Sequence, residues 1–238
     1  MALFDIIRGF SVISMVLFHL SYDLHYLYGH PLSFFHPPFQ DIWRASISWT
    51  FLFVAGCMCS FSRNGLKRAA RYLGVAAAVY VVTLLAAVDT PISFGIIFCM
   101  GTSTLVDWLL DRAGIAPRGY LAAIVLLLAF LLLRGVPHGY VGMGQMSIEV
   151  PRQLYAYRAL SFLGFPGPGF SSGDYYPLVP FTLMYLTGAA AGRRWRETGY
   201  PAWAYRISCR PLQFVGRHAL IVYVLHQPLL IGILELLR

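Results

Sequence analysis

Charged residues are scarce in this chain of 238 residues: Asp, Glu, Lys and Arg together make up 12% of it, whereas hydrophobic residues make up 58%. Soluble domains carry about twice that share of charge, so the composition excludes an ordinary soluble protein. The sequence also lacks the Walker phosphate-binding loop, the Gly-x-Ser-x-Gly nucleophile elbow, the His-Glu-x-x-His zinc motif and the dinucleotide fingerprint. We therefore expect an integral membrane protein whose chemistry is carried by a few polar side chains.

Cysteine is scarce as well. Cys57, Cys59, Cys99 and Cys209 are the four cysteines, and their spacing fits neither a zinc site nor a disulfide framework. Three of them lie within apolar runs, where we expect them to pack as small apolar residues. We expect no metal.

Long apolar runs predict an all-α, polytopic transmembrane helix bundle with about seven spans. These spans are 6–28, 43–62, 70–88, 92–110, 119–136, 176–192 and 214–237. The sequence contains no convincing repeat, so we expect a single domain over 1–238. One connection is long, at about 137–175, and its FPGPGF segment cannot be helical. Connections of this length are usually functional or disordered.

The basic residues are unevenly distributed, and the net charge is +8. Most of them fall between spans two and three, four and five, and six and seven. The positive-inside rule then places the N-terminus in the cytoplasm and the 137–175 connection on the outer face. The distribution of the basic residues is thus explained by membrane topology, and these residues can also bind an anionic ligand from the cytoplasm. We expect no nucleic acid partner.

Three ionisable residues form a stripe along the first span: Arg8, His19 and Asp23. Eleven residues at 100° each bring His19 to within about 20° of Arg8, and Asp23 follows one turn later. Ionisable groups at membrane depth usually mark a functional pathway. Asp23 can accept a hydrogen bond from one imidazole nitrogen and leave the other free as a base, or it can be a residue of the helix end. Arg8 either obeys the positive-inside rule or contacts a phosphate.

The last span carries a second histidine, His226, within its apolar run. His226 lies roughly 13 Å above Arg217, and His19 lies roughly 16 Å above Arg8. Since both arginines mark the inner interface, the two histidines are expected at similar depth and can line one cavity. Alternatively, His226 bonds backbone carbonyls freed by Pro228.

Polar residues near the outer face are candidates for binding a second substrate. His36 lies with His25 and His30 around the first outer loop, where histidines are commonly just solvated. Asp174 precedes Tyr176 and Pro177 at the start of the sixth span, and it either caps that helix or binds a hydroxyl group.

Several segments carry a family resemblance that covers nearly the whole chain. In order, they are DIIRGFSVISMVLFHLSYDL, FLFVAGCMCS, ISFGIIFCMGTS, FLGFPGPGFSSGDYYPLVPF and VGRHALIVYVLHQPLL. The chain resembles the heparan-α-glucosaminide N-acetyltransferase-like membrane family, in its small bacterial branch. In the wider group of transmembrane acyltransferases, an Arg precedes a catalytic His by the spacing of Arg8 and His19.

The resemblance implies an integral protein of the bacterial inner membrane. It implies transfer of an acyl group, expected to be acetyl, from cytoplasmic acyl-CoA to a hydroxyl or amine of a sugar-like acceptor at the outer face. By position, His19 is then the catalytic base and Asp23 its neighbour. The CoA head is expected near Arg8, Arg63, Lys67, Arg68 and Arg217, and the acceptor near His226, Asp174, Tyr176 and His36.

Two departures from the family pattern matter. Similar proteins often carry His where this chain has Phe98, so a role of the fourth span in catalysis is open. The larger lysosomal relatives carry Asn at the place of His19 and a His in the following loop. Under that scheme His30 or His36 would be the catalyst.

Two other classes of function fit the same residues. A proton-coupled transporter would use His19 and Asp23 as a proton relay, and a haem or metal protein would use His19 and His226 as axial ligands. The expected partners are the lipid bilayer and a small-molecule or glycan acceptor. A homodimer is expected only because such dimers are common.

Overall fold

The computed structural model describes residues 2–86 and 90–238, which form two compact units. The first unit contains residues up to 54 together with 200–238, and the second contains residues 55–199. Helices dominate both units, as the apolar runs predict. The single-domain organisation over 1–238 stays a prediction.

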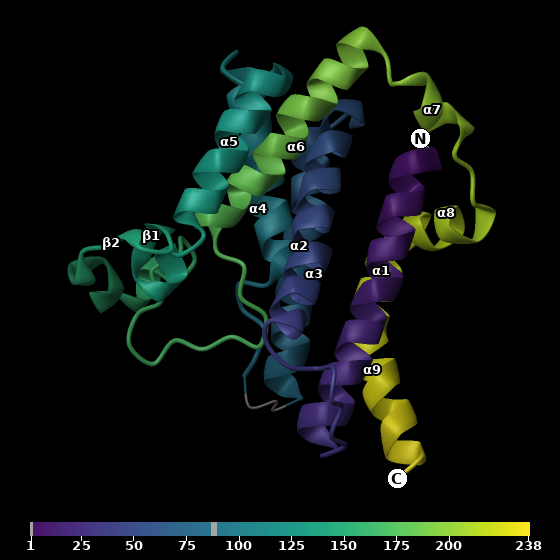
Figure 1. The fold of residues 1–238 in the computed structure, drawn as a ribbon, viewed down its shortest axis with the longest axis vertical. Helices are drawn as coiled ribbons and strands as arrows, with labels where there is room; N and C mark the ends of the chain where they lie inside the picture. The colour runs from purple at the N-terminus through teal and green to yellow at the C-terminus, as the bar shows by residue number, and fades with distance from the viewer. Residues whose placement is uncertain (1, 87–89) are drawn as a thin grey trace. The chain divides into compact units, whose positions relative to one another are not determined.

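In the first unit, helix α1 packs along α8 and α9 (Figure 1). Its helical elements are α1 (Ala2–Tyr22), the π-helical turn η1 (Asp23–Leu27), α2 (Phe39–Cys57, whose last turn enters the second unit), α7 (Ala202–Arg206), α8 (Arg210–Arg217) and α9 (Ala219–Leu236). Met15, Phe18, Phe35 and Ile47 form a buried core that joins α1 to α2. The core thereby fixes the α1 segment that carries His19.

In the second unit, α3 packs against α4 and α5 packs against α6. The helices are α3 (Gly65–Leu85), α4 (Ile96–Arg112), α5 (Gly119–Leu133) and α6 (Leu178–Thr198), with 3-10 turns at Met58–Phe61, Val136–His138, Arg152–Ala156 and Arg158–Leu160. A buried ion pair joins α4 to α6, since Arg193 Nη2 lies 2.9 Å from an oxygen of Asp107. Removing either partner of a buried ion pair leaves an uncompensated buried charge and strongly destabilises the fold.

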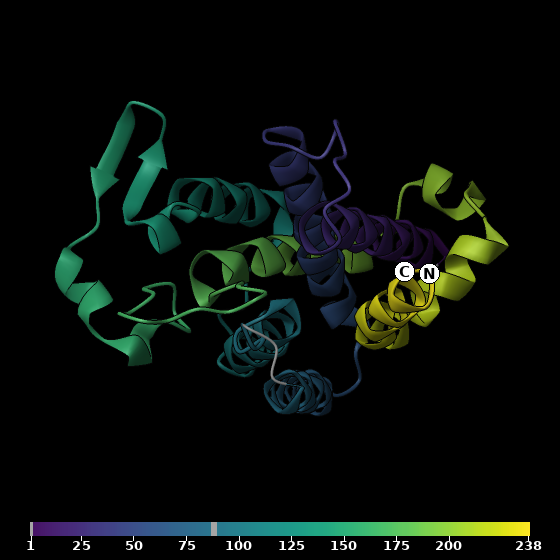
Figure 2. The same ribbon diagram turned by 90° about the horizontal axis from the view of Figure 1, so that it is seen from below.

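The all-α prediction needs one correction, because the 137–175 connection contains a β-hairpin. Strands β1 (Tyr140–Met143) and β2 (Met146–Glu149) pair antiparallel and project from the end of α5 (Figure 2). Gly144, in the two-residue turn, has φ +56°, a left-handed conformation that glycine adopts without strain. The FPGPGF segment contains no helix, as predicted.

Each predicted span overlaps a helix, but the count of seven is not confirmed. Five helical segments of the described residues are long and apolar enough to cross a membrane: Ala2–Leu27, Phe39–Phe61, Gly65–Leu85, Gly119–His138 and Ala219–Leu236. Helices α4 and α6 are not among them. Residues 87 and 88, the end of the third predicted span, lie outside the described residues. The orientation of the N-terminus stays a prediction.

The last predicted span, 214–237, is wrong as one continuous helix, because the chain breaks at His218 between α8 and α9. Helix α8 lies so close to α1 that a Cβ atom added at Gly216 would meet the backbone oxygen of Asp5 at 1.8 Å. Conversely, a Cβ at Gly9 would meet the backbone oxygen of Leu212 at 2.0 Å. This backbone contact between α1 and α8 sets the direction of α8, and α9 begins a new helix after the break.

Candidate functional site

Two histidine side chains of the first unit lie against each other. The imidazole rings of His19 on α1 and His226 on α9 have centroids 4.8 Å apart and are inclined by 59°. The sequence predicted this proximity from the depth of each residue above its arginine, and the structure confirms it. Both residues lie in helical segments that are long and apolar enough to cross a membrane, where two imidazoles in contact form a candidate proton-transfer site.

The tautomer of His226 follows from its hydrogen bonding. Its Nδ1 lies 2.6 Å from the backbone oxygen of Tyr223, an acceptor, so Nδ1 carries the hydrogen and Nε2 carries a lone pair. His226 is 8% exposed, and its Nε2 is buried without a hydrogen-bond partner among the described residues. The alternative prediction named a carbonyl freed by Pro228, which is that of Val224; the carbonyl bound is that of Tyr223 instead. A buried lone pair without a partner is costly unless a ligand or water uses it.

The carboxylate of Asp23 is fully buried and binds an amide rather than an imidazole. Gln227 Nε2 lies 3.0 Å from each of its two oxygens. Of the two alternatives predicted for Asp23, the hydrogen bond from His19 is therefore wrong. The physical reason is that the Gln227 amide reaches both oxygens from α9, while the His19 ring contacts His226. This contact, the Asp23–Gln227 clamp, ties η1, the turn that directly follows α1, to α9 beside the histidine pair.

At the other end of α1, two arginines share one buried carboxylate. Arg8 Nη2 donates a hydrogen bond to Asp5, and Arg217 Nε lies 3.6 Å from the other Asp5 oxygen. Arg217 also donates to Gln213 at 3.3 Å. Since two guanidinium groups face one carboxylate, this Asp5–Arg8–Arg217 cluster keeps a net positive charge. It can attract an anion such as a phosphate.

The other basic residues expected to bind CoA lie on α3 or just before it, in the second unit. Arg63 and Lys67 are exposed. Arg68 instead donates to the backbone oxygen of Ala55 at 2.9 Å and lies over the ring of Tyr72. Of these three residues, Arg63 and Lys67 have the free side chains that an anion would need.

The residues predicted to bind the acceptor near the outer face belong to two different units. Asp174 Oδ2 accepts from the backbone N–H of Ile96 at 2.9 Å, so it caps α4, and the prediction that it caps the sixth span is wrong. The backbone N–H of Tyr176 donates to Phe94, and its ring packs on Phe181. Both belong to the second unit. In the first unit, His36 is exposed and contacts the ring of His25.

Sequence reasoning missed two functional neighbours. Gln227 was visible as a polar residue beside His226 within an apolar run, and Asp5 as an acid three residues before Arg8. Among residues 2–86 and 90–238, no group of three or more His, Cys, Asp and Glu residues could hold a metal ion. The rings of His19 and His226 touch, which leaves no room for a haem plane between them.

The comparison with known families identifies the chain over most of its length. The family model described as heparan-alpha-glucosaminide N-acetyltransferase, catalytic, matches residues 1–228. No curated protein and no solved structure matches the chain. The match confirms the family resemblance and favours an enzyme over a transporter.

Proposed function

We propose that this chain, which belongs to the heparan-alpha-glucosaminide N-acetyltransferase catalytic family, is a membrane acetyltransferase that uses acetyl-CoA as its donor. We propose further that the donor enters from the cytoplasm and that the acceptor is a hydroxyl or amine of a sugar-like molecule at the outer face of a bacterial inner membrane. The contact between His19 and His226, within a chain of this family, is the observation that carries the proposal.

The Asp5–Arg8–Arg217 cluster is the proposed binding site for the phosphate groups of CoA. Guanidinium groups bind phosphate oxygens in pairs, and the shared carboxylate holds both arginines in place. Arg63 and Lys67, which are exposed near the start of α3 in the second unit, stay sequence-based predictions for CoA binding. Arg8 and His19 are about 16 Å apart along α1. The pantetheine arm would cover this distance to bring the thioester to the histidines.

Proton transfer is assigned to His19. The acceptor oxygen or nitrogen attacks the thioester carbonyl carbon as His19 takes the acceptor's proton. The carbon–sulfur bond then breaks, and the CoA sulfur leaves with that proton. The lone pair on Nε2 of His226 stabilises the imidazolium that forms on His19, because an acceptor beside a new cation lowers its free energy. The Asp23–Gln227 clamp positions both helices for this step.

Replacing His19 tests the assignment of the base. Removal of a general base typically lowers the rate about 10²- to 10⁴-fold. We therefore expect His19→Ala to lower kcat for acetyl transfer to a panel of amino and hydroxyl sugars by that factor. Acetyl-CoA should still raise its melting temperature in detergent. His30→Ala and His36→Ala are the comparison variants, and both should keep kcat; His36→Ala would raise only KM if His36 contacts the acceptor. Loss of kcat in either variant, with kcat retained in His19→Ala, would move the base to the loop.

His226 is tested by two variants that differ in one property. Gln places a hydrogen-bond acceptor near the position of Nε2, whereas Phe fills the space of the ring without one. We expect kcat to fall modestly in His226→Gln and about 10-fold or more further in His226→Phe. Equal rates in the two variants would show that the lone pair has no role.

A further inference from the structure

The hairpin of the 137–175 connection has one apolar and one polar face. Residues that pair directly across two strands share a face, and successive pairs alternate between faces. The pairs Val141–Ile148 and Met143–Met146 therefore lie on one face. The opposite face carries Tyr140–Glu149 and Gly142–Ser147, which include the one charged residue of the two strands. We name the first of these the apolar hairpin face: Val141, Met143, Met146 and Ile148.

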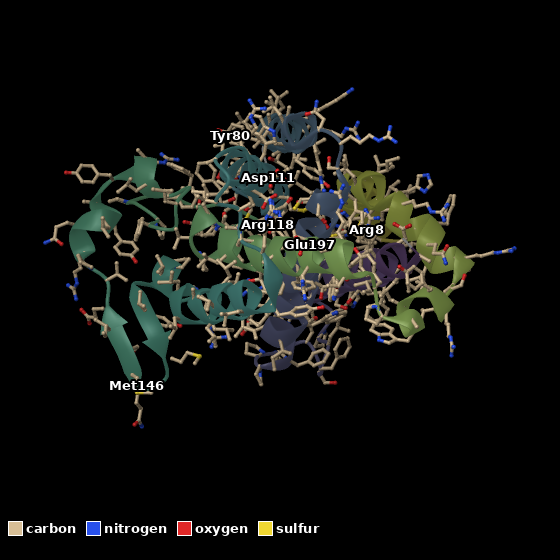
Figure 3. The ribbon with its side chains drawn as sticks, turned by 90° about the horizontal axis from the view of Figure 1, so that it is seen from above. Arg8, Tyr80, Asp111, Arg118, Met146 and Glu197 are labelled. Carbon is tan, nitrogen blue, oxygen red and sulfur yellow. The ribbon has the colours of Figure 1, made fainter. Side chains whose placement is uncertain are left out.

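This apolar hairpin face lies open in the described structure. Met146 is 86% exposed, Ile148 75% and Met143 49%. Figure 3 shows Met146 at the tip of the hairpin, directed away from the helices of its unit. Contiguous exposed apolar side chains mark a surface that contacts something other than water.

The hairpin begins where a candidate membrane span ends. The apolar segment containing α5 runs through His138, and β1 starts at Tyr140, two residues later. Two residues cover at most about 7 Å, so the hairpin starts close to the end of that candidate span. Helix α5 itself exposes a stripe of apolar side chains at helical spacing, Leu121, Val125, Leu128 and Leu132. The apolar surface that α5 offers to lipid therefore extends along the helix toward the hairpin.

We propose that the apolar hairpin face is inserted into the lipid at the boundary where α5 ends, so that the hairpin anchors the 137–175 connection to the bilayer. Amphipathic elements with one uncharged apolar face bind membranes in this way. A second copy of the chain is a poorer occupant, because a stable protein interface needs about 20–30 residues on each side and this face offers four.

A pair of adjacent cysteine substitutions tests the proposal without altering the helices. Met146→Cys and Ser147→Cys would each be labelled with an environment-sensitive fluorophore in protein reconstituted into phosphatidylcholine vesicles, and labelled unsubstituted protein would supply the background from the four native cysteines. Residue 147 is exposed on the opposite face of the same strand and is the matched control. We expect lipids brominated on the acyl chain to quench the probe at 146 several-fold more than the probe at 147. Iodide in the water should show the reverse preference.

Three results would overturn the proposal. Equally weak quenching of both probes by the brominated lipid would show that the hairpin lies in water, and equally strong quenching would show that neither face is preferentially directed to the lipid. Strong iodide quenching at 146 would also show that the hairpin lies in water. Protection of the 146 probe from both quenchers, increasing with protein density in the vesicles, would show that another copy covers the face. None of these measurements depends on acetyltransferase activity.

Discussion

The Asp23–Gln227 clamp should contribute a measurable pairwise free energy to the stability of the first unit. Asp23 is fully buried, and the Gln227 amide is the hydrogen-bond partner of its side chain among the described residues. Replacing Gln227 with Leu keeps the approximate volume and removes the donor. The carboxylate then stays buried with no partner, which is the costly half of a broken hydrogen bond.

The size of the effect follows from the type of bond. A hydrogen bond to a charged group contributes about 1.5–3 kcal/mol, and breaking a buried charged pair costs at most about 5 kcal/mol. We expect Gln227→Leu to lower the free energy of unfolding by about 2–3 kcal/mol. The double variant Asp23→Leu/Gln227→Leu should lose less than the sum of the single losses, by about 1.5–3 kcal/mol, because neither polar group is then left alone.

The assay is a double-mutant cycle measured by denaturant unfolding in detergent micelles. Asp41→Asn is the control, because its carboxylate is 60% exposed and lies 3.4 Å from Arg44 on the surface of α2. Exposed pairs of this kind contribute about 0–1 kcal/mol. A coupling energy below about 0.5 kcal/mol between Asp23 and Gln227 would refute the argument that the amide stabilises the carboxylate.

Two further predictions concern the other end of α1. Gly216→Ala should lower the free energy of unfolding by about 1–3 kcal/mol or more, because its Cβ would collide with the backbone of α1. The control is Gly232→Ala in α9, whose Cβ would meet nothing within 4 Å, so this variant should be neutral or more stable. Both variants would be compared by thermal unfolding. Equal effects of the two alanines would contradict close packing of α1 on α8. Asp5→Asn should lower the melting temperature without ligand and enlarge the increase that CoA produces, because the phosphates then supply the charge that Arg8 and Arg217 have lost. An unchanged CoA effect would place the phosphates elsewhere.

The features predicted correctly from the sequence are those that depend on helix geometry. The rise per residue is constant along α1, so counting from Arg8 gives the position of His19. The count from Arg217 crossed the break at His218, but it was accurate enough that His226 was expected at the depth of His19, and the two rings are in contact. The partner of Asp23 could not be found in this way. Helical spacing pointed to His19, four residues away, while the actual partner, Gln227, is 204 residues away in the chain.

The errors in the 137–175 connection have a similar origin. Asp174 stands just before α6 in sequence, so it reads as a cap for that helix, yet its carboxylate reaches Ile96 at the start of α4. Tertiary contacts of this kind leave no periodic signal. The hairpin did leave one, since apolar residues alternate on both sides of Gly144, but four-residue strands are too short to stand out within an apolar chain.

Helix α1 runs without a break from Ala2 to Tyr22, so it fixes the distance between Arg8 and His19. Each residue adds about 1.5 Å of length and about 100° of rotation. One residue inserted between Arg8 and His19 would therefore turn the imidazole away from α9 as well as shift it. A donor with a shorter or longer arm between its phosphates and its thioester would leave its carbonyl short of His19 or beyond it. Selection of the donor would then depend on the length of a helix rather than on the shape of a pocket.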